Sequence, residues 1–145
     1  MISRKLDVLQ HSLFLFGPRQ VGKSTWIHSK FKSEFFYIDL LDHDTFLSYS
    51  RQPQQLKTDV QYQMTKHGVR VCIIDEVQKL PALLDVVQQL MLISDCQFVL
   101  TGSSARKLKR GGANMLAGRA LQYFMFPLTH AEITDDFVLD DVLMY

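Results

Sequence analysis

The sequence predicts an α/β protein in which a mainly parallel sheet lies between two layers of helices. Short runs of consecutive apolar residues alternate along the chain with longer segments that carry apolar residues at helical spacing. Runs that are apolar at every position are typical of strands covered on both faces, as in parallel sheets. Several of these runs end in small or polar residues, and the carboxyl ends of parallel strands are where such proteins gather functional groups. With 145 residues, the chain has the length of one domain.

Five strands are expected from the apolar and aromatic runs. They are Ser12–Phe16, Phe35–Leu40, Val71–Ile74, Gln97–Leu100 and Ala120–Phe126. Pro127 ends the last run, because proline lacks the N–H group that a central strand must donate.

Four helices are expected between the strands. They are Lys23–Phe31, Asp42–Ser50, residues 54–66 and Pro81–Ile93. In the third, Leu56, Val60 and Met64 recur every four residues and form one apolar face. Gly68 follows as a stop signal, and Pro81 suits the first turn of the fourth helix.

The charge balance excludes a general affinity for polyanions. Sixteen Lys and Arg residues face fifteen Asp and Glu residues, so the formal charge is +1 and any basic site must be local. Apolar runs such as Leu13–Phe16 are far shorter than the ~20 residues that cross a bilayer. Asp7 and Gln10 interrupt the segment after Arg4 and Lys5 that a signal peptide would need to be apolar. We therefore expect a cytoplasmic protein with no membrane span.

The cysteines, the histidines and the tryptophan are expected to be structural. Cys72 and Cys96 lie in strand-like contexts without CxxC spacing, which is typical of reduced core cysteines. The five histidines show no metal-ligand spacing. Trp26 is expected to pack against the sheet rather than to stack on a nucleotide base.

One segment predicts phosphate binding. Residues 17–24, GPRQVGKS, match the pattern GxxxxGK[ST] between an expected strand and an expected helix. In that context the glycines let successive backbone N–H groups point at phosphate oxygens, and the helix adds the positive end of its dipole. Lys23 is expected to reach the β- and γ-phosphates and Ser24 to ligate Mg²⁺, while Thr25 either contacts the α-phosphate or bonds the local backbone. The expected nucleotide-binding residues are Gly17, Pro18, Arg19, Gln20, Val21, Gly22, Lys23, Ser24 and Thr25.

A second segment supplies two adjacent carboxylates. Four apolar residues, 71–74, precede Asp75 and Glu76, which is the Walker B pattern with a second acid. Asp75 is expected to hold Mg²⁺, directly or through water, and Glu76 to orient or deprotonate an attacking water. Alone, two acids after a strand are typical of a solvated turn. The phosphate-binding pattern upstream favours the metal and water site.

Further polar residues follow the next two expected strands. Thr101, Ser103 and Ser104 either contact the γ-phosphate and its water or serve as ordinary turn hydroxyls. The basic run Arg106–Arg110 is typical of a solvated face. Arg119 stands alone before the last strand and is the better candidate for an arginine that stabilises transition-state charge.

Five segments occur in an order that resembles a family of prokaryotic AAA-like P-loop ATPases. They are GPRQVGKST, IIDEVQKLP, FVLTGSSARKLKRGG, MLAGR and FPLTHAEI. The resemblance implies a P-loop NTPase three-layer sandwich with sheet order 5-1-4-3-2, in which the strands of Cys72 and Cys96 are neighbours.

Carried over by position, the resemblance implies a complete ATPase site. It places ATP on residues 17–25, Mg²⁺ on Ser24 and Asp75, and the catalytic acid on Glu76. It also implies a polar sensor at Ser103 or Thr101 and an arginine, Arg119, that acts on the site of a neighbouring copy in a homo-oligomer.

Family members usually continue into a lid and a C-terminal region, so residues 1–145 are expected to be the ATPase core without them. The leading hypothesis is an Mg²⁺-dependent ATPase core that drives or gates an effector. The alternative is an ATP-dependent binding or switch module with negligible hydrolysis, because a site without a lid admits water. Nucleic-acid binding through Arg106–Arg110 is a third hypothesis, and a kinase acting on a small acceptor is a fourth that Glu76 beside Asp75 disfavours.

Overall fold

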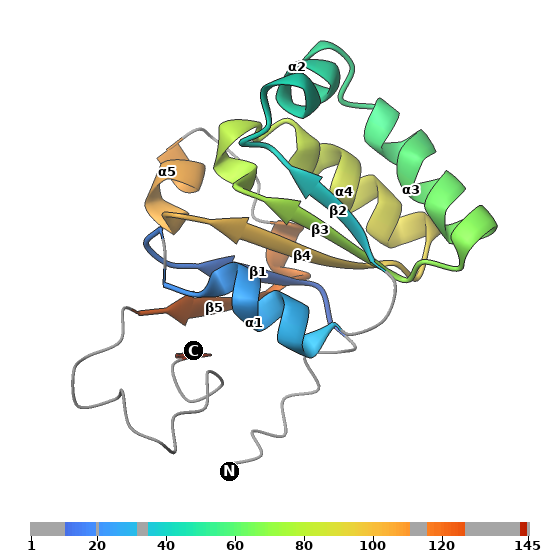
Figure 1. Cartoon of the computed structure of the whole chain (residues 1–145). Coiled ribbons are helices and arrows are strands. Elements are labelled where there is room, and N and C mark those ends of the chain that lie inside the picture. Colours follow the sequence, from blue (N-terminus) through green and yellow to red (C-terminus); the bar gives the residue numbers. More distant parts are fainter. Residues whose placement is uncertain (1–10, 20, 32–34, 111–115, 127–142, 145) are drawn as a thin grey trace.

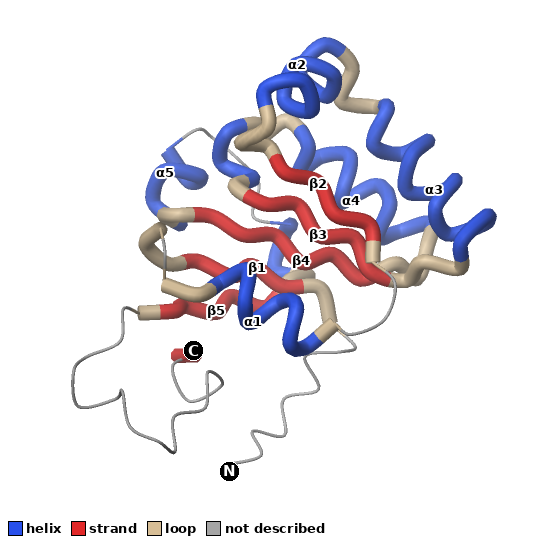
Figure 2. Tube along the Cα trace, in the orientation of Figure 1, coloured by secondary structure: helices blue, strands red, loops and turns tan. Residues whose placement is uncertain are grey.

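The computed structural model describes residues 11–19, 21–31, 35–110, 116–126 and 143–144. Its element order alternates strands and helices, as the sequence predicts. Figure 1 shows a twisted sheet with α1 on one side and α3 and α4 on the other, and Figure 2 separates the helices from the strands by colour. This is the expected three-layer α/β sandwich of P-loop NTPases.

Five parallel strands form the sheet. They are β1 (Leu13–Phe16), β2 (Phe36–Asp39), β3 (Val71–Asp75), β4 (Gln97–Gly102) and β5 (Leu121–Met125). Their order is β2-β3-β4-β1-β5, which is the predicted order 5-1-4-3-2 read from the opposite edge. A two-residue strand, β6 (Leu143–Met144), pairs antiparallel with β5 and was not predicted.

Four helices lie close to their predicted positions: α1 (Lys23–Lys30), α2 (His43–Arg51), α3 (Gln55–His67) and α4 (Leu83–Ile93). The structure adds α5 (Ala105–Arg110) and the 3₁₀ turns η1 (Val77–Lys79) and η2 (Leu116–Gly118), which were not predicted. The Asp42 side chain accepts a bond from Thr45 N at 3.1 Å and caps α2. Gly68 ends α3 at φ 66°, in the left-handed region. Residues 81 and 82 form a turn, so α4 begins two residues later than predicted.

Both faces of the sheet are buried. Along β1 the side chains alternate, so Leu13 and Leu15 pack on the α1 side with Trp26. Phe14 and Phe16 pack on the other side, among residues of α3 and α4. Trp26 is fully buried, which agrees with the expected packing against the sheet. The apolar run of β1 therefore reflects burial on two faces.

The two cysteines lie in the core as free thiols. Cys72 is in β3, and Cys96 immediately precedes the neighbouring strand β4. Burial raises the pKa of Cys96 to about 12 and holds the pKa of Cys72 well above its usual range. Within the described ranges, no helix is both long and apolar enough to cross a bilayer.

Candidate nucleotide-binding site

The loop between β1 and α1 requires glycine at both ends. A Cβ on Gly17 would lie 2.3 Å from the main-chain oxygen of Met125 in β5, so only glycine allows this close approach. Gly17 N also donates to Gly102 O at 3.1 Å, which ties the loop to the end of β4. Gly22 adopts φ 95° immediately before α1, a conformation that favours glycine. Of the predicted loop, residue 20 lies outside the described residues.

Lys23 begins α1 and folds back over this loop. Its side chain is buried, and Nζ donates to Gly17 O and, at 2.9 Å, to Pro18 O. Desolvation lowers the pKa of Lys23, and the nearby charges of Glu76 and Asp75 oppose that shift. The ammonium group therefore lies within its own loop and in the field of the acid pair.

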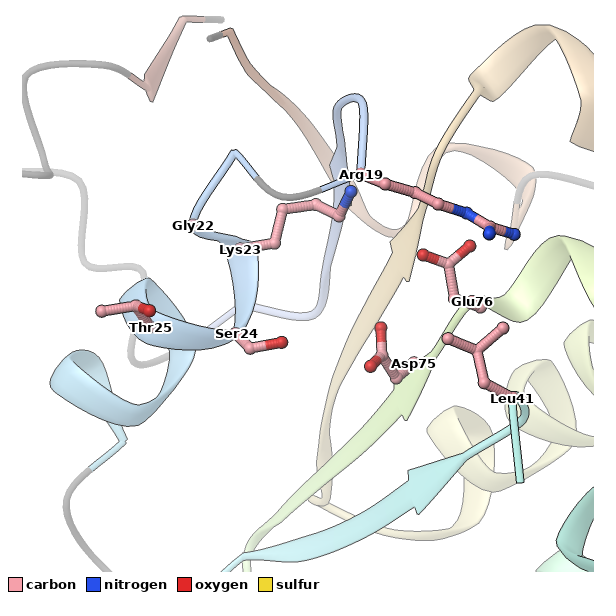
Figure 3. A pocket seen from close by; sticks show the side chains of 8 residues that line it. All are labelled: Arg19, Gly22, Lys23, Ser24, Thr25, Leu41, Asp75 and Glu76. Carbon is pink, nitrogen blue, oxygen red and sulfur yellow. The ribbon is translucent and has the colours of Figure 1, made fainter. Parts of the chain in front are cut away.

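A cavity of about 500 Å³ opens at the carboxyl ends of β1 and β3 (Figure 3). Its lining combines a cationic loop with two carboxylates: Arg19, Gly22, Lys23, Ser24, Thr25, Leu41, Asp75 and Glu76. The structure thus brings together both predicted motifs, which are more than fifty residues apart in the sequence. In Figure 3 the Arg19 side chain extends toward Glu76, and the Ser24 hydroxyl is directed across the cavity toward Asp75.

Asp75 ends β3 with both carboxylate oxygens engaged by hydroxyl groups. Thr101 Oγ1 donates to Oδ1, and the Tyr37 phenol donates to Oδ2 at 2.5 Å. Burial, followed by the bond to Asp75, raises the pKa of Tyr37, so this phenol remains protonated. Each carboxylate oxygen has a second lone-pair site, so Asp75 retains acceptor capacity toward the cavity.

Glu76 adopts a left-handed backbone conformation with φ 61° and is 4% exposed. Its N–H donates to Thr101 Oγ1 at 3.0 Å. The Gln78 side chain donates through Nε2 to Glu76 Oε2, and Nε2 also lies 3.3 Å from Ser103 Oγ. Gln78 therefore joins the second acid to the turn after β4.

Thr101 and Ser103, the two predicted sensor positions, differ in their contacts. Thr101 is fully buried, and its hydroxyl is bonded to Asp75 and to the backbone of Glu76. Ser103 is partly exposed and lines a second hollow of about 370 Å³, together with Gly17 and Pro18 on the other side of the loop. Thr101 is therefore bonded to the acid pair, whereas Ser103 does not line the cavity of about 500 Å³.

Arg119 lies at the opposite end of the sheet from the cavity. Its N–H bonds Leu116 O, and the next strand begins two residues later, where Leu121 pairs with Leu13 at the amino end of β1. Arg119 is exposed and does not line the cavity. The fold does not bring this arginine to the site of its own chain.

The basic run after β4 forms α5, which was not predicted as a helix. Leu108 of this helix is fully buried in the core. Arg106 and Lys107 are exposed, as expected for a solvated face.

Tyr37 and Gln78 are the site residues that sequence reasoning missed. Gln78 stands two residues after Glu76 in the same segment, so its position was a signal for contact with the acid pair. Tyr37 comes from β2, and only the neighbouring position of β2 and β3 in the sheet brings it to Asp75. Leu41, which lines the cavity and is 48% exposed, follows the same strand.

The donor set fits magnesium when phosphate is bound. Ser24 and Asp75 offer hydroxyl and carboxylate oxygens, which are the ligands Mg²⁺ takes beside phosphates and water. Among the residues for which the structure gives positions, no group of three or more His, Cys, Asp or Glu side chains could hold a metal by itself. A metal at this cavity would therefore depend on a ligand that supplies further oxygens.

Comparison with known proteins identifies the family. The chain is similar to domain III of the Thermotoga maritima replication initiation protein DnaA, with 16% identity and a TM-score of 0.44 over 81% of this chain and 56% of that one. It is similar to a replication initiator DnaA bound to AMPPCP and single-stranded DNA, with 16% identity and a TM-score of 0.44 over 78% and 40% of the two chains. It thus spans about half the length of those structures, and no curated protein matches it. A family described as AAA domain matches residues 10–134, so the chain belongs to the AAA domain family.

Proposed function

We propose that this chain is the core of an ATPase that binds ATP with Mg²⁺ in the cavity between the loop 17–22 and the acid pair. Membership of the AAA domain family supports a nucleotide-binding ATPase module. The single observation that carries the proposal is the cavity of about 500 Å³. Lys23 and Ser24 line it together with Asp75 and Glu76. Phosphoryl transfer requires a lysine and a hydroxyl group near the phosphates and carboxylates near the metal and the attacking water, and this cavity contains all of them.

Binding begins with the loop. The backbone N–H groups at the start of α1 and the helix dipole attract the phosphates. Lys23 exchanges its bonds to Gly17 O and Pro18 O for phosphate oxygens, so the ammonium group trades neutral carbonyl acceptors for negatively charged ones. When bound, Mg²⁺ held by Ser24 and Asp75 would neutralise charge on the β- and γ-phosphates.

In the hydrolysis step Glu76 would act as the general base. Its carboxylate accepts a proton from the water that attacks the γ-phosphorus, and the products are ADP and inorganic phosphate. Glu76 is 4% exposed and lines the cavity beside Lys23 and Ser24, so its carboxylate is available to such a water. Ser103 would bond a γ-phosphate oxygen, because Gln78 links the turn that carries it to Glu76. Arg119 would act on the site of a neighbouring copy, since the site of its own chain lies at the other end of the sheet.

One observation favours a second function, an ATP-dependent switch with negligible turnover. The Gln78 amide already donates to Oε2 of Glu76, so this oxygen is engaged before any water arrives. In this alternative the chain binds ATP and transmits the bound state to a partner without hydrolysing it.

Binding and turnover, measured separately, test the proposal. Titration with a fluorescent ATP analogue, with Mg²⁺ and with EDTA, should give saturable binding that Lys23→Ala abolishes. Phosphate release should fall at least about a hundredfold in Glu76→Gln, the loss expected for removing a general base. Asp59→Asn is the matched control, because Asp59 is a hydrogen-bonded carboxylate on α3 outside the cavity.

The outcomes separate the two functions. Saturable binding without phosphate release at high protein concentration supports the switch. Absence of saturable binding by the wild-type protein rejects both. Equal phosphate release by the wild type and Glu76→Gln rejects the role of Glu76.

A further inference from the structure

The phenol of Tyr37 is bonded to one of the two expected magnesium ligands. It donates its single proton to Asp75 Oδ2 at 2.5 Å, since an ionised carboxylate can only accept. A directed hydrogen bond therefore runs from β2 to the carboxylate at the end of β3.

The ring of Tyr37 is held in place from two sides. It stacks on His28 of α1, with centroids 6.1 Å apart and planes 23° apart. Phe35 packs against it in a tilted arrangement at 6.4 Å. The strand below it is also fixed, because Tyr37 pairs with Ile73 in the register of β2 and β3. The phenol oxygen therefore has little freedom to leave its position beside Asp75.

We propose that Tyr37 is a positioning residue for the magnesium site, an inference that rests on the proposed function. A carboxylate that ligates a cation must keep a lone pair directed to the ion. Tyr37 donates to one oxygen of Asp75 and holds the carboxylate in one orientation, so its remaining lone pairs stay available to the cavity. Partners of this kind around metal ligands are typically worth 10- to 100-fold in metal affinity.

The bonds of Thr101 complete the arrangement. Because Thr101 holds the other oxygen of Asp75, the carboxylate is fixed on both sides. Removing the phenol hydroxyl frees one edge of Asp75 while leaving Lys23 and the loop as they are. The expected loss therefore falls on the magnesium-dependent part of nucleotide binding.

The test compares Tyr37→Phe with the wild type. The Kd of a fluorescent ATP analogue is measured in EDTA and in saturating Mg²⁺, and the ratio of the two gives the gain from the metal. In Tyr37→Phe we expect the Kd in EDTA to stay within about twofold and the gain from Mg²⁺ to fall about tenfold or vanish. A residue that only supports folding would change both values.

Tyr49→Phe is the matched control. Like Tyr37, Tyr49 donates its hydroxyl proton to a carboxylate, that of Asp59, at 2.6 Å, and it lies on α2, outside the cavity. The Tyr49→Phe substitution should leave both Kd values unchanged.

The gain in affinity from Mg²⁺ decides the outcome. A gain in Tyr37→Phe equal to that of the wild type overturns the proposal, and a larger gain overturns it by showing that the phenol competes with the ion. A wild type that binds the analogue without any gain from Mg²⁺ overturns this proposal alone, whereas one that binds no analogue overturns the proposed function as well.

A measurement on the wild-type protein covers the case in which Tyr37→Phe does not fold. The five tyrosines are labelled with ¹³C at Cζ, the protein is saturated with the ATP analogue, and Mn²⁺ replaces Mg²⁺. The paramagnetic ion should broaden the Tyr37 signal before the others. If all five signals respond alike or not at all, the ion is not beside Tyr37 and the inference fails.

Discussion

Gly17→Ala probes the contact that holds the phosphate loop to the sheet. The added Cβ would lie 2.3 Å from Met125 O, well inside the 3.0 Å below which such contacts essentially never occur. The opposing atom belongs to the backbone of β5, which pairs with β1 through the register Phe16 with Phe124, so it cannot move without disturbing that ladder. Overpacking against such a rigid neighbour costs about 1–3 kcal/mol, and we expect the upper end.

Urea unfolding followed through Trp26 fluorescence measures the loss. Trp26 is the only tryptophan and is fully buried, so its emission reports the folded state. Gly68→Ala is the control, because its Cβ would meet nothing within 4 Å and only the left-handed backbone at φ 66° is strained. That strain costs about 1 kcal/mol.

The comparison of the two variants decides the prediction. Gly17→Ala should unfold at a clearly lower urea concentration than Gly68→Ala, and it should also weaken binding of the ATP analogue. A Gly17→Ala protein as stable as the wild type, or more stable than the control, would refute the close approach of the loop to β5.

Two further predictions concern buried hydrogen bonds and buried thiols. Thr101→Val removes the hydroxyl shared by Asp75 and the Glu76 N–H, and it should cost about 2–3 kcal/mol in urea unfolding. Thr101→Ser should recover most of this, and equal losses in both variants would exclude the hydroxyl as the cause. Cys72 and Cys96 should resist a thiol reagent at pH 8 until urea is added, and rapid labelling of the folded protein would contradict their burial. The pKa of a thiol is near 9 in the unfolded chain, whereas burial raises the pKa of Cys96 to about 12 in the folded protein. The free energy of unfolding should therefore fall as pH rises from 9 to 12, and it should fall less steeply in Cys96→Ala.

The sequence predicted the parts of the fold that local patterns specify. The run Leu13–Phe16 before Gly17 is apolar at every position because β1 is buried on both faces. The phosphate-binding pattern of residues 17–24 predicts both a turn and the start of a helix. The sheet order came from the resemblance, since spacing along the chain does not determine which strands pair. The short β6 carries too few residues to give any periodic signal.

Contacts within the site were harder to predict because they depend on that strand order. Tyr37 reaches Asp75 only because β2 lies beside β3, and neither residue has a sequence neighbour that indicates the other. Gln78 bends back to Glu76 because a 3₁₀ turn follows the acid pair, a feature with no periodicity of its own. Arg119 was predicted to act on another copy, and its place at the far end of the sheet leaves that prediction standing.

The left-handed backbone at Glu76 explains how two adjacent acids share one cavity. In an extended strand, successive side chains point to opposite faces, so Glu76 would face away from Asp75 and Lys23. At φ 61° the chain turns as the strand ends, and both carboxylates line the same cavity. This conformation costs a residue other than glycine about 1–2 kcal/mol. The bonds from the Glu76 N–H to Thr101 and from Gln78 to its carboxylate offset that cost, so the polar network beneath the site stabilises the strained turn that the proposed chemistry requires.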